Sequence, residues 1–198
     1  MADLLIEYTL KAEGYNLVAG VDEAGRGPLA GPVCAAAVIL PDDFQAEGVN
    51  DSKKLTEKKR ETLYDYIIEN ALAYAIEFAD HKEIDEYNIR NATFRAMSRA
   101  VANLQVKADY VIIDGNAINY IDTPHSCVIK GDSKSLSIAA ASILAKVTRD
   151  RFMDKLDKEY PMYGFKKHKG YPTKLHYEAL KEHGPCPYHR MTFNLKLD

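Results

Sequence analysis

Three apolar runs of this chain each end in acidic residues flanked by glycine. The first run leads into Asp22 and Glu23, the second into Asp114 and the third into Asp132. Such runs are typical of buried strands, and the carboxyl ends of neighbouring strands in an α/β sheet converge on one crevice. Four carboxylates gathered there would repel one another strongly unless cations lay between them. The pattern therefore favours a fold that places these acids around divalent metal ions.

The loop after the first acid pair is rich in glycine. Asp22 and Glu23 would point to opposite faces of a strand, so both reach one point only where the strand ends or bends. Gly25 and Gly27 permit such a bend and a close approach of the backbone to a ligand. With Arg26 between them, the loop indicates a divalent metal beneath a phosphate. A plain turn with solvated acids is the alternative for this segment taken alone.

Alternating strand and helix patterns predict an α/β fold. We expect a hairpin through the glycine-rich turn, formed by the first two strands, and a long loop over 161–173. The expected strands are 17–21, 32–40, 73–78, 110–113 and 127–129. The expected helices cover 56–71, two stretches within 81–103, 135–159 and 174–183, with Thr56 as an N-cap.

Length and composition predict one domain over residues 1–198. No apolar stretch approaches the roughly 20 residues that cross a bilayer, and the acidic N-terminus is unlike a secretory signal. The three cysteines are far apart in the sequence, which fits a reducing compartment. We therefore expect a cytoplasmic protein with no membrane segment, and a monomer.

The charges are distributed unevenly along the chain. From Lys130 onward there are 14 basic and 8 acidic residues, whereas the preceding 129 residues hold 12 basic and 21 acidic ones. A basic C-terminal third on an acidic protein is expected where one face meets nucleic-acid phosphates. Solvated helix faces are the alternative explanation.

The acidic strand ends also predict a reaction. Carboxylate oxygens select Mg²⁺ or Mn²⁺ over Zn²⁺, and two such ions suit in-line hydrolysis of a phosphodiester. A competing pattern, His183, Cys186 and His189, has spacing that could recruit zinc. It lacks a convincing fourth ligand, and two prolines restrict its loop, so anchoring of the C-terminal segment by His189 and Arg190 is the preferred interpretation.

Several motifs together resemble bacterial ribonuclease HII, the type 2 ribonuclease H, along nearly the whole chain. They are residues 20–28 (GVDEAGRGP), 50–55 (NDSKKL), 113–115 (IDG), 130–132 (KGD), 140–150 (AASILAKVTRD) and 168–172 (HKGYP). The resemblance implies an RNase H-like fold: a central mixed β-sheet flanked by helices, with a small C-terminal helical part over about 160–198. It also implies two Mn²⁺ or Mg²⁺ ions with substrate, and cleavage of the RNA strand of RNA/DNA hybrids. Duplex DNA would be cut 5′ to single embedded ribonucleotides, leaving 3′-hydroxyl and 5′-phosphate ends.

The same resemblance assigns roles to individual residues. Asp22, Glu23, Asp114 and Asp132 match the catalytic, metal-binding acids, and it stays open whether Asp132 binds metal directly or through water. Residues 25–27 match the loop that reads the ribose 2′-hydroxyl, a role that exposed backbone groups can fill. Further candidates for contact with the sugar or phosphates are Tyr171, Lys53, Lys54, Ser142, Lys146, Arg149 and Lys169. Tyr171 would stack on the sugar after the ribonucleotide. The alternatives are that Tyr171 only packs on the surface, that Ser142 is a small packing residue and that the lysines are merely solvated.

Two rival functions are consistent with parts of this sequence. A type 3 ribonuclease H has a similar core and usually an added N-terminal substrate-binding domain, for which the roughly 16 residues before the first strand leave no room. A nucleic-acid-binding module without catalysis would not need acids at three strand ends, because uncompensated carboxylates repel phosphates.

Overall fold

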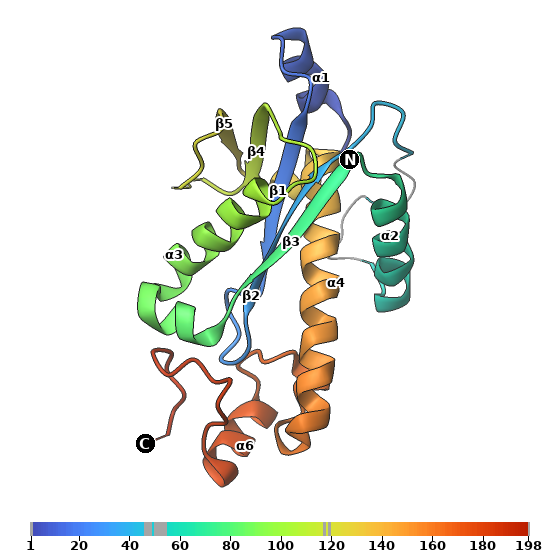
Figure 1. Ribbon diagram of the computed structural model, residues 1–198. Coiled ribbons are helices and arrows are strands. Elements are labelled where there is room, and N and C mark those ends of the chain that lie inside the picture. The colour runs from blue at the N-terminus through green and yellow to red at the C-terminus, as the bar shows by residue number, and fades with distance from the viewer. Residues whose placement is uncertain (1, 46–48, 50–54, 117, 119, 198) are drawn as a thin grey trace.

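A five-stranded mixed sheet forms the centre of the computed structural model, which describes residues 2–45, 49, 55–116, 118 and 120–197 (Figure 1). Its strands are β1 (Val18–Ala24), β2 (Val33–Ile39), β3 (Ala73–Ala79), β4 (Tyr110–Asp114) and β5 (His125–Val128). They are ordered β3-β2-β1-β4-β5 across the sheet. β2 pairs antiparallel with both β1 and β3. β4 pairs parallel with β1 on one side and with β5 on the other. The predicted mixed sheet and its first hairpin are confirmed.

The strand that carries the first acids is longer than predicted. We expected it to end at Val21, but Asp22 pairs with Ala36 of β2 and Glu23 with Ala35, so the strand continues to Ala24. On its other side Val21 lies beside Ile113 of β4. Because the two strands are parallel, Asp22 and Asp114, which follow this pair, lie at the same end of the two strands.

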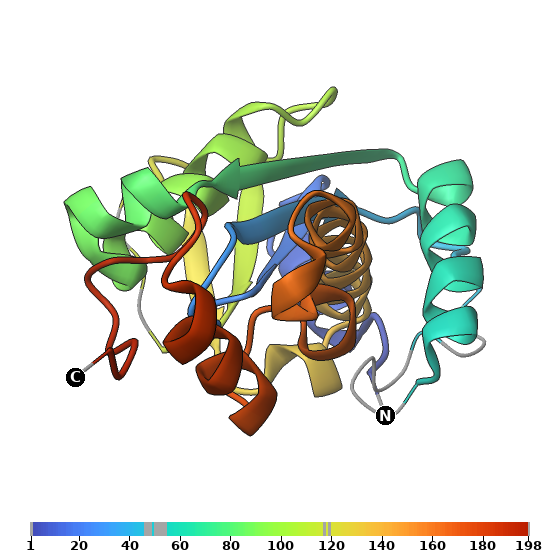
Figure 2. The same cartoon turned by 90° about the horizontal axis from the view of Figure 1, so that it is seen from below.

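Helices cover both faces of the sheet (Figures 1 and 2). α3 (His81–Ala102) packs its buried side chains against one face, and α4 (Leu136–Glu159) and α2 (Glu57–Asn70) pack theirs against the other. α4 approaches β1 very closely: a Cβ atom added to Gly20 would lie 2.2 Å from the Ser137 carbonyl carbon. This close packing brings the following turns of α4 over the acidic end of β1.

Local capping explains where these helices begin. The side chains of Thr56 and Ser135 accept hydrogen bonds from the backbone N–H of Lys59 and Ile138, so both residues are N-caps. α3 is kinked at Asn88, whose φ is 65°, and the Asn88 side chain caps the second stretch. The prediction of two helical stretches here is confirmed.

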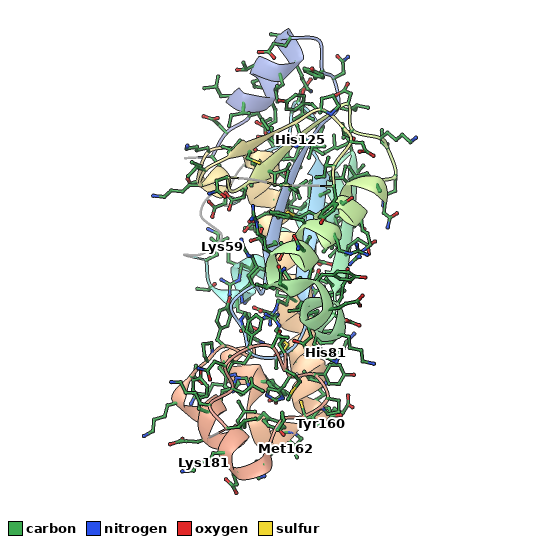
Figure 3. All side chains as sticks on the ribbon, turned by 90° about the vertical axis from the view of Figure 1, so that its left-hand side faces the viewer. Lys59, His81, His125, Tyr160, Met162 and Lys181 are labelled. Atoms are coloured by element: carbon green, nitrogen blue, oxygen red, sulfur yellow. The ribbon has the colours of Figure 1, made fainter. Side chains whose placement is uncertain are left out.

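A small C-terminal part follows α4 and contains η2 (Pro161–Tyr163), α5 (Phe165–His168) and α6 (Lys174–His183). The expected loop over 161–173 is therefore wrong in part, because it holds two short helical turns. This part has its own apolar cluster, in which Phe165 and Leu180 pack with Leu29 and Met153. In Figure 3 the part that carries Met162 and Lys181 lies at the opposite end of the molecule from α1.

The N-terminal helix α1 (Leu5–Ala12) was not predicted. Its buried Glu7 accepts hydrogen bonds from the Ser135 hydroxyl at 2.7 Å and from the Ser137 N–H at 3.1 Å, which ties α1 to the start of α4. None of the described helices has both the length and the apolar composition that crossing a membrane requires.

Candidate active site

A cavity of about 560 Å³ opens where the acidic ends of β1 and β4 meet α4 and the C-terminal part. Five elements or loops supply its walls: β1 with the loop after it, β4, α2, α4 and the loop before α6. The lining residues are Asp22, Glu23, Ala24, Gly25, Arg26, Gly27, Arg60, Asp114, Ser142, Lys146 and Tyr171. The cavity therefore joins segments that are far apart in the sequence.

Asp22 lies at the floor of this cavity and is 5% exposed. Burial is the largest cause that raises the pKa of its carboxyl well above the usual range, and the negative charges of Glu23 and Asp114 raise it further. Hydrogen bonds from the Ser142 hydroxyl and from the Glu23 N–H, the latter at 2.7 Å, act in the opposite direction. The carboxylate is thus held in a place where its charge is not fully compensated by the protein.

Glu23 is in a similar position. Burial raises the pKa of its carboxyl, and the charge of Asp114 adds to the increase. The Arg26 guanidinium, 3.3 Å from Glu23 Oε1, opposes both effects. Asp22, Glu23 and Asp114, three of the four acids that were expected to lie together, are therefore close enough for their charges to act on one another.

The fourth predicted acid, Asp132, is not among the residues that line the cavity. Strand β5 ends at Val128, so Asp132 is not at a strand end but in the short helical turn η1 (Gly131–Ser133). The turn is fastened to the cavity by the Gly131 N–H, which donates to Asp114 Oδ1 at 2.6 Å. The role of Asp132 toward a metal ion stays a prediction.

The donor set suits a hard divalent cation. Its oxygens come from carboxylates, and an added positive charge would relieve the repulsion that raises the pKa of Asp22. Across the part of the chain that the structure describes, no three acidic, histidine or cysteine side chains lie together as a ready-made metal cage. This arrangement fits Mg²⁺ or Mn²⁺, since such an ion takes one or two carboxylates and fills its other positions with water and substrate phosphate.

Residues 25–27, the glycine loop, lie between a buried arginine and an exposed tyrosine. Gly25 has a φ of 99°, and a Cβ atom added there would lie 2.0 Å from Arg149 Nε. A Cβ atom added to Gly27 would lie 3.5 Å from the ring of Tyr171, which is 43% exposed. The predicted loop and the predicted tyrosine thus form adjoining parts of one wall.

Arg149 is not a surface cation, so its prediction as a phosphate contact is wrong. Its guanidinium is buried and donates to the carbonyls of Pro32 at 2.9 Å, Lys169 at 3.0 Å and Ala30 at 3.3 Å. Arg190 is fully buried as well. It donates to the carbonyls of Gly25, Arg26 and Gly31 between β1 and β2, which confirms the expected anchoring of the C-terminal segment. Burial, and then the charge of Arg149, lowers the pKa of Arg190 to about 9, which leaves it charged at neutral pH.

The other predicted cations have mixed outcomes. Ser142 and Lys146 both line the cavity, one helical turn apart, and Lys146 also pairs with Asp150 at 2.7 Å. Lys169 does not line the cavity and forms an ion pair with Asp154. Lys53 and Lys54 lie outside the described residues.

Arg60, on the first turn of α2, was missed by the sequence analysis although it lines the cavity. Its Nη1 donates to the Leu55 carbonyl at 2.5 Å. The residue follows the NDSKKL motif by five positions, a proximity that could have marked it as a candidate.

The alternative zinc pattern has no support in the described geometry. His189 is buried, accepts the Cys186 N–H at 2.9 Å through Nδ1, and has its Nε2 3.0 Å from His176 Nε2. Both ring nitrogens of His189 are thus engaged within the protein.

Comparison with known proteins identifies the family. A family model described as Ribonuclease HII matches residues 19–196. The chain belongs to the ribonuclease HII family. One relative, a ribonuclease HII of Bacteroides thetaiotaomicron, is 60% identical over 89% of this chain and 89% of its own length. The chain is accordingly a metal-dependent ribonuclease, a hydrolase.

Solved structures agree with this assignment. The ribonuclease H2 of Pyrococcus horikoshii is 30% identical, with a TM-score of 0.78 over 91% of this chain and 95% of that one. Bst-RNase HIII, solved in complex with Mn²⁺, has a TM-score of 0.68 over 90% of this chain and 67% of that one, at 20% identity. The second likeness concerns the fold alone; the first, with the family match, confirms the RNase H-like architecture.

Proposed function

We propose that this protein cuts the RNA strand of RNA/DNA hybrids and also cuts duplex DNA 5′ to a single embedded ribonucleotide. The observation that carries the proposal is the position of the glycine loop and Tyr171 on the wall of the cavity whose floor holds Asp22. A nuclease that selects ribonucleotides needs its metal-binding acids and a group that senses the 2′-hydroxyl within one nucleotide of each other. The presence of the acids and the glycine loop on one cavity supports this assignment.

Asp22, Glu23 and Asp114 would hold two Mn²⁺ or Mg²⁺ ions together with substrate, and Asp132 would assist them directly or through water. Bound ions of this kind activate the attacking water and stabilise the leaving oxygen of a phosphodiester, which gives 3′-hydroxyl and 5′-phosphate ends. The protein's own part is to keep these carboxylates ionised and close together. The Ser142 hydroxyl and the Glu23 N–H contribute to this by stabilising the charged form of Asp22.

Basic side chains around the acids provide contacts for the flanking phosphates. Lys146 lines the cavity from α4 and Arg60 lines it from α2. Each cation that meets a phosphate makes binding sensitive to salt. Lys53 and Lys54 are candidates for the same role.

Tyr171 and residues 25–27 would select the nucleotide at the cleavage site. Peptide groups of the glycine loop can hydrogen-bond the 2′-hydroxyl, the group that separates RNA from DNA. The Tyr171 ring would pack on the next sugar, where a ribose 2′-hydroxyl would crowd it. This arrangement favours a junction at which a ribonucleotide is followed by deoxyribonucleotide.

The decisive experiment uses an end-labelled DNA duplex with one ribonucleotide, incubated with Mg²⁺ and with Mn²⁺ separately. We expect a single nick on the 5′ side of the ribonucleotide, with ligatable ends on the downstream fragment. A uniform RNA/DNA hybrid should be cut as well. Cleavage of the hybrid without cleavage at the single ribonucleotide would instead fit a type 3-like activity, and binding without cleavage of either would indicate a non-catalytic module.

A further inference from the structure

Arg190 lies beneath the glycine loop and is 0% exposed. Its Nη2 donates to the Gly25 carbonyl at 2.6 Å, and its Nη1 donates to the Arg26 carbonyl at 3.0 Å. Its Nε donates to the Gly31 carbonyl at 2.9 Å, two residues before β2 begins. One planar guanidinium therefore fixes two successive peptide groups of the loop and the point where the chain returns to the sheet.

These bonds determine where the N–H groups of the loop point. In a trans peptide the C=O and the N–H of one unit point in opposite directions, and the described chain has no cis peptide bond. Because the Gly25 and Arg26 carbonyls point toward Arg190, the N–H groups of Arg26 and Gly27 point away from it. Residues 25–27 line the cavity and Arg190 does not, so these two donors face the cavity.

Arg190 is itself held rigidly. Asp85 of α3 accepts hydrogen bonds from the Met191 N–H at 2.9 Å and from the Thr192 N–H at 3.0 Å, which fixes the backbone next to it. The Phe193 ring lies 5.1 Å from the guanidinium carbon. The direction of the two loop donors is thus set by a chain of contacts that extends to the opposite helix layer.

Two successive N–H groups on one side of the backbone form a small concave site for an oxygen with free lone pairs. A hydroxyl oxygen and a phosphate oxygen share this chemistry. The Glu23 carboxylate, 3.3 Å from the Arg26 side chain, lies beside the loop and disfavours an anionic phosphate there. The neutral hydroxyl of a ribose fits the site better.

We propose that Arg190 is a positioning residue for ribonucleotide selection: it turns the Arg26 and Gly27 N–H groups toward the cavity, where they receive the ribose 2′-hydroxyl. The inference rests on the proposed function of the loop. It adds a residue about 165 positions away in the sequence that has no contact with substrate.

The test compares the affinity of two duplexes that differ by one 2′-hydroxyl. In an Asp114→Asn background with Mg²⁺, the dissociation constants are measured for a duplex with one ribonucleotide and for the all-DNA duplex. We expect Arg190→Lys to lower the preference for the ribonucleotide at least fivefold and to leave the affinity for the DNA duplex within twofold. An unchanged preference in the folded variant, or equal losses for both duplexes, would overturn the inference. If the Asp114→Asn protein that keeps Arg190 binds the two duplexes equally well, the proposed function itself is refuted.

Arg99→Lys is the control, since Arg99 of α3 also donates to a backbone carbonyl, that of Phe78 at 2.7 Å, and pairs with Glu83, while it does not line the cavity. We expect it to lower the melting temperature and to keep the preference. If Arg99→Lys lowers the preference as much as Arg190→Lys, general loosening explains the effect and the assignment to Arg190 fails.

A measurement on the unmodified protein makes the test independent of how the variants fold. By NMR, the Arg26 and Gly27 amides should be rigid, with order parameters near the value of about 0.85 typical of structured backbone. Their resonances should shift with the ribonucleotide duplex and not with the DNA duplex. Order parameters below about 0.6 at these amides, or equal shifts with both duplexes, would contradict the proposal.

Discussion

Asp22 of β1 and Asp114 of β4 directly follow the paired residues Val21 and Ile113 of two parallel strands, and the negative charge of Asp114 raises the pKa of the Asp22 carboxyl. The sheet register therefore creates a local repulsion that the fold tolerates. Removing one of these charges should stabilise the metal-free protein and abolish its activity. The same register thus links stability to function.

For Asp22→Asn we expect the free energy of unfolding without metal to increase by about 1 to 2 kcal/mol, because a buried and repelled carboxylate is replaced by a neutral amide. Cleavage of a single-ribonucleotide duplex should fall at least about a thousandfold. Urea unfolding in EDTA and a cleavage assay measure the two effects. Asp65→Asn, at an exposed carboxylate on α2, serves as the control and should change neither. A destabilised Asp22→Asn protein would contradict the electrostatic argument.

Divalent metal should stabilise the native protein and not the Asp22→Asn variant. An ion that binds only the folded state adds about 2.7 kcal/mol at a hundred times its dissociation constant. We expect Mn²⁺ to raise the melting temperature of the native protein in a concentration-dependent way, with binding heat in calorimetry. An equal rise in both proteins would place the ion elsewhere on the surface.

The sequence predicts well whatever depends on neighbouring residues. Thr56 begins its helix as expected because its hydroxyl reaches an N–H only three positions away. Arg149 was misjudged because its carbonyl partners come from residues about 20 and 119 positions away, so nothing near it in the chain indicates burial. The extension of β1 past Val21 likewise depends on its pairing with β2, which a strand's own residues do not reveal.

Tyr171→Ala should lose activity mainly on single-ribonucleotide duplexes. The side chain is 43% exposed, so its removal should cost little stability, within about 0.5 to 1 kcal/mol. Its ring adjoins Gly27, and we expect at least a tenfold loss on the single-ribonucleotide duplex with a smaller loss on a uniform RNA/DNA hybrid. Tyr171→Phe keeps the ring and should retain most activity. Equal losses on the two substrates would rule out a role at the junction.

The loop that carries Tyr171 should also lose stability in acid, because it rests on neutral histidines. His176 Nδ1 lies 3.0 Å from the Tyr171 carbonyl, and His176 Nε2 lies 3.0 Å from His189 Nε2. Since His189 Nδ1 accepts the Cys186 N–H, a consistent assignment has His189 donating to His176 and His176 donating to Tyr171. Protonation of either ring would break this series, as both nitrogens of a charged imidazole are donors.

Burial lowers the pKa of His176 and of His189 to about 4, below the value of about 6.5 expected in the unfolded chain. Between these two pH values the unfolded state binds more protons than the folded state. The contribution of these histidines to the free energy of unfolding should therefore be fully present above pH 6.5 and decrease as the pH falls toward 4. Urea unfolding at several pH values measures this slope. His176→Asn, which does not titrate, should be less stable at pH 7 and show a shallower slope between pH 6.5 and 4. An identical slope in the two proteins would show that His176 does not contribute to the acid sensitivity.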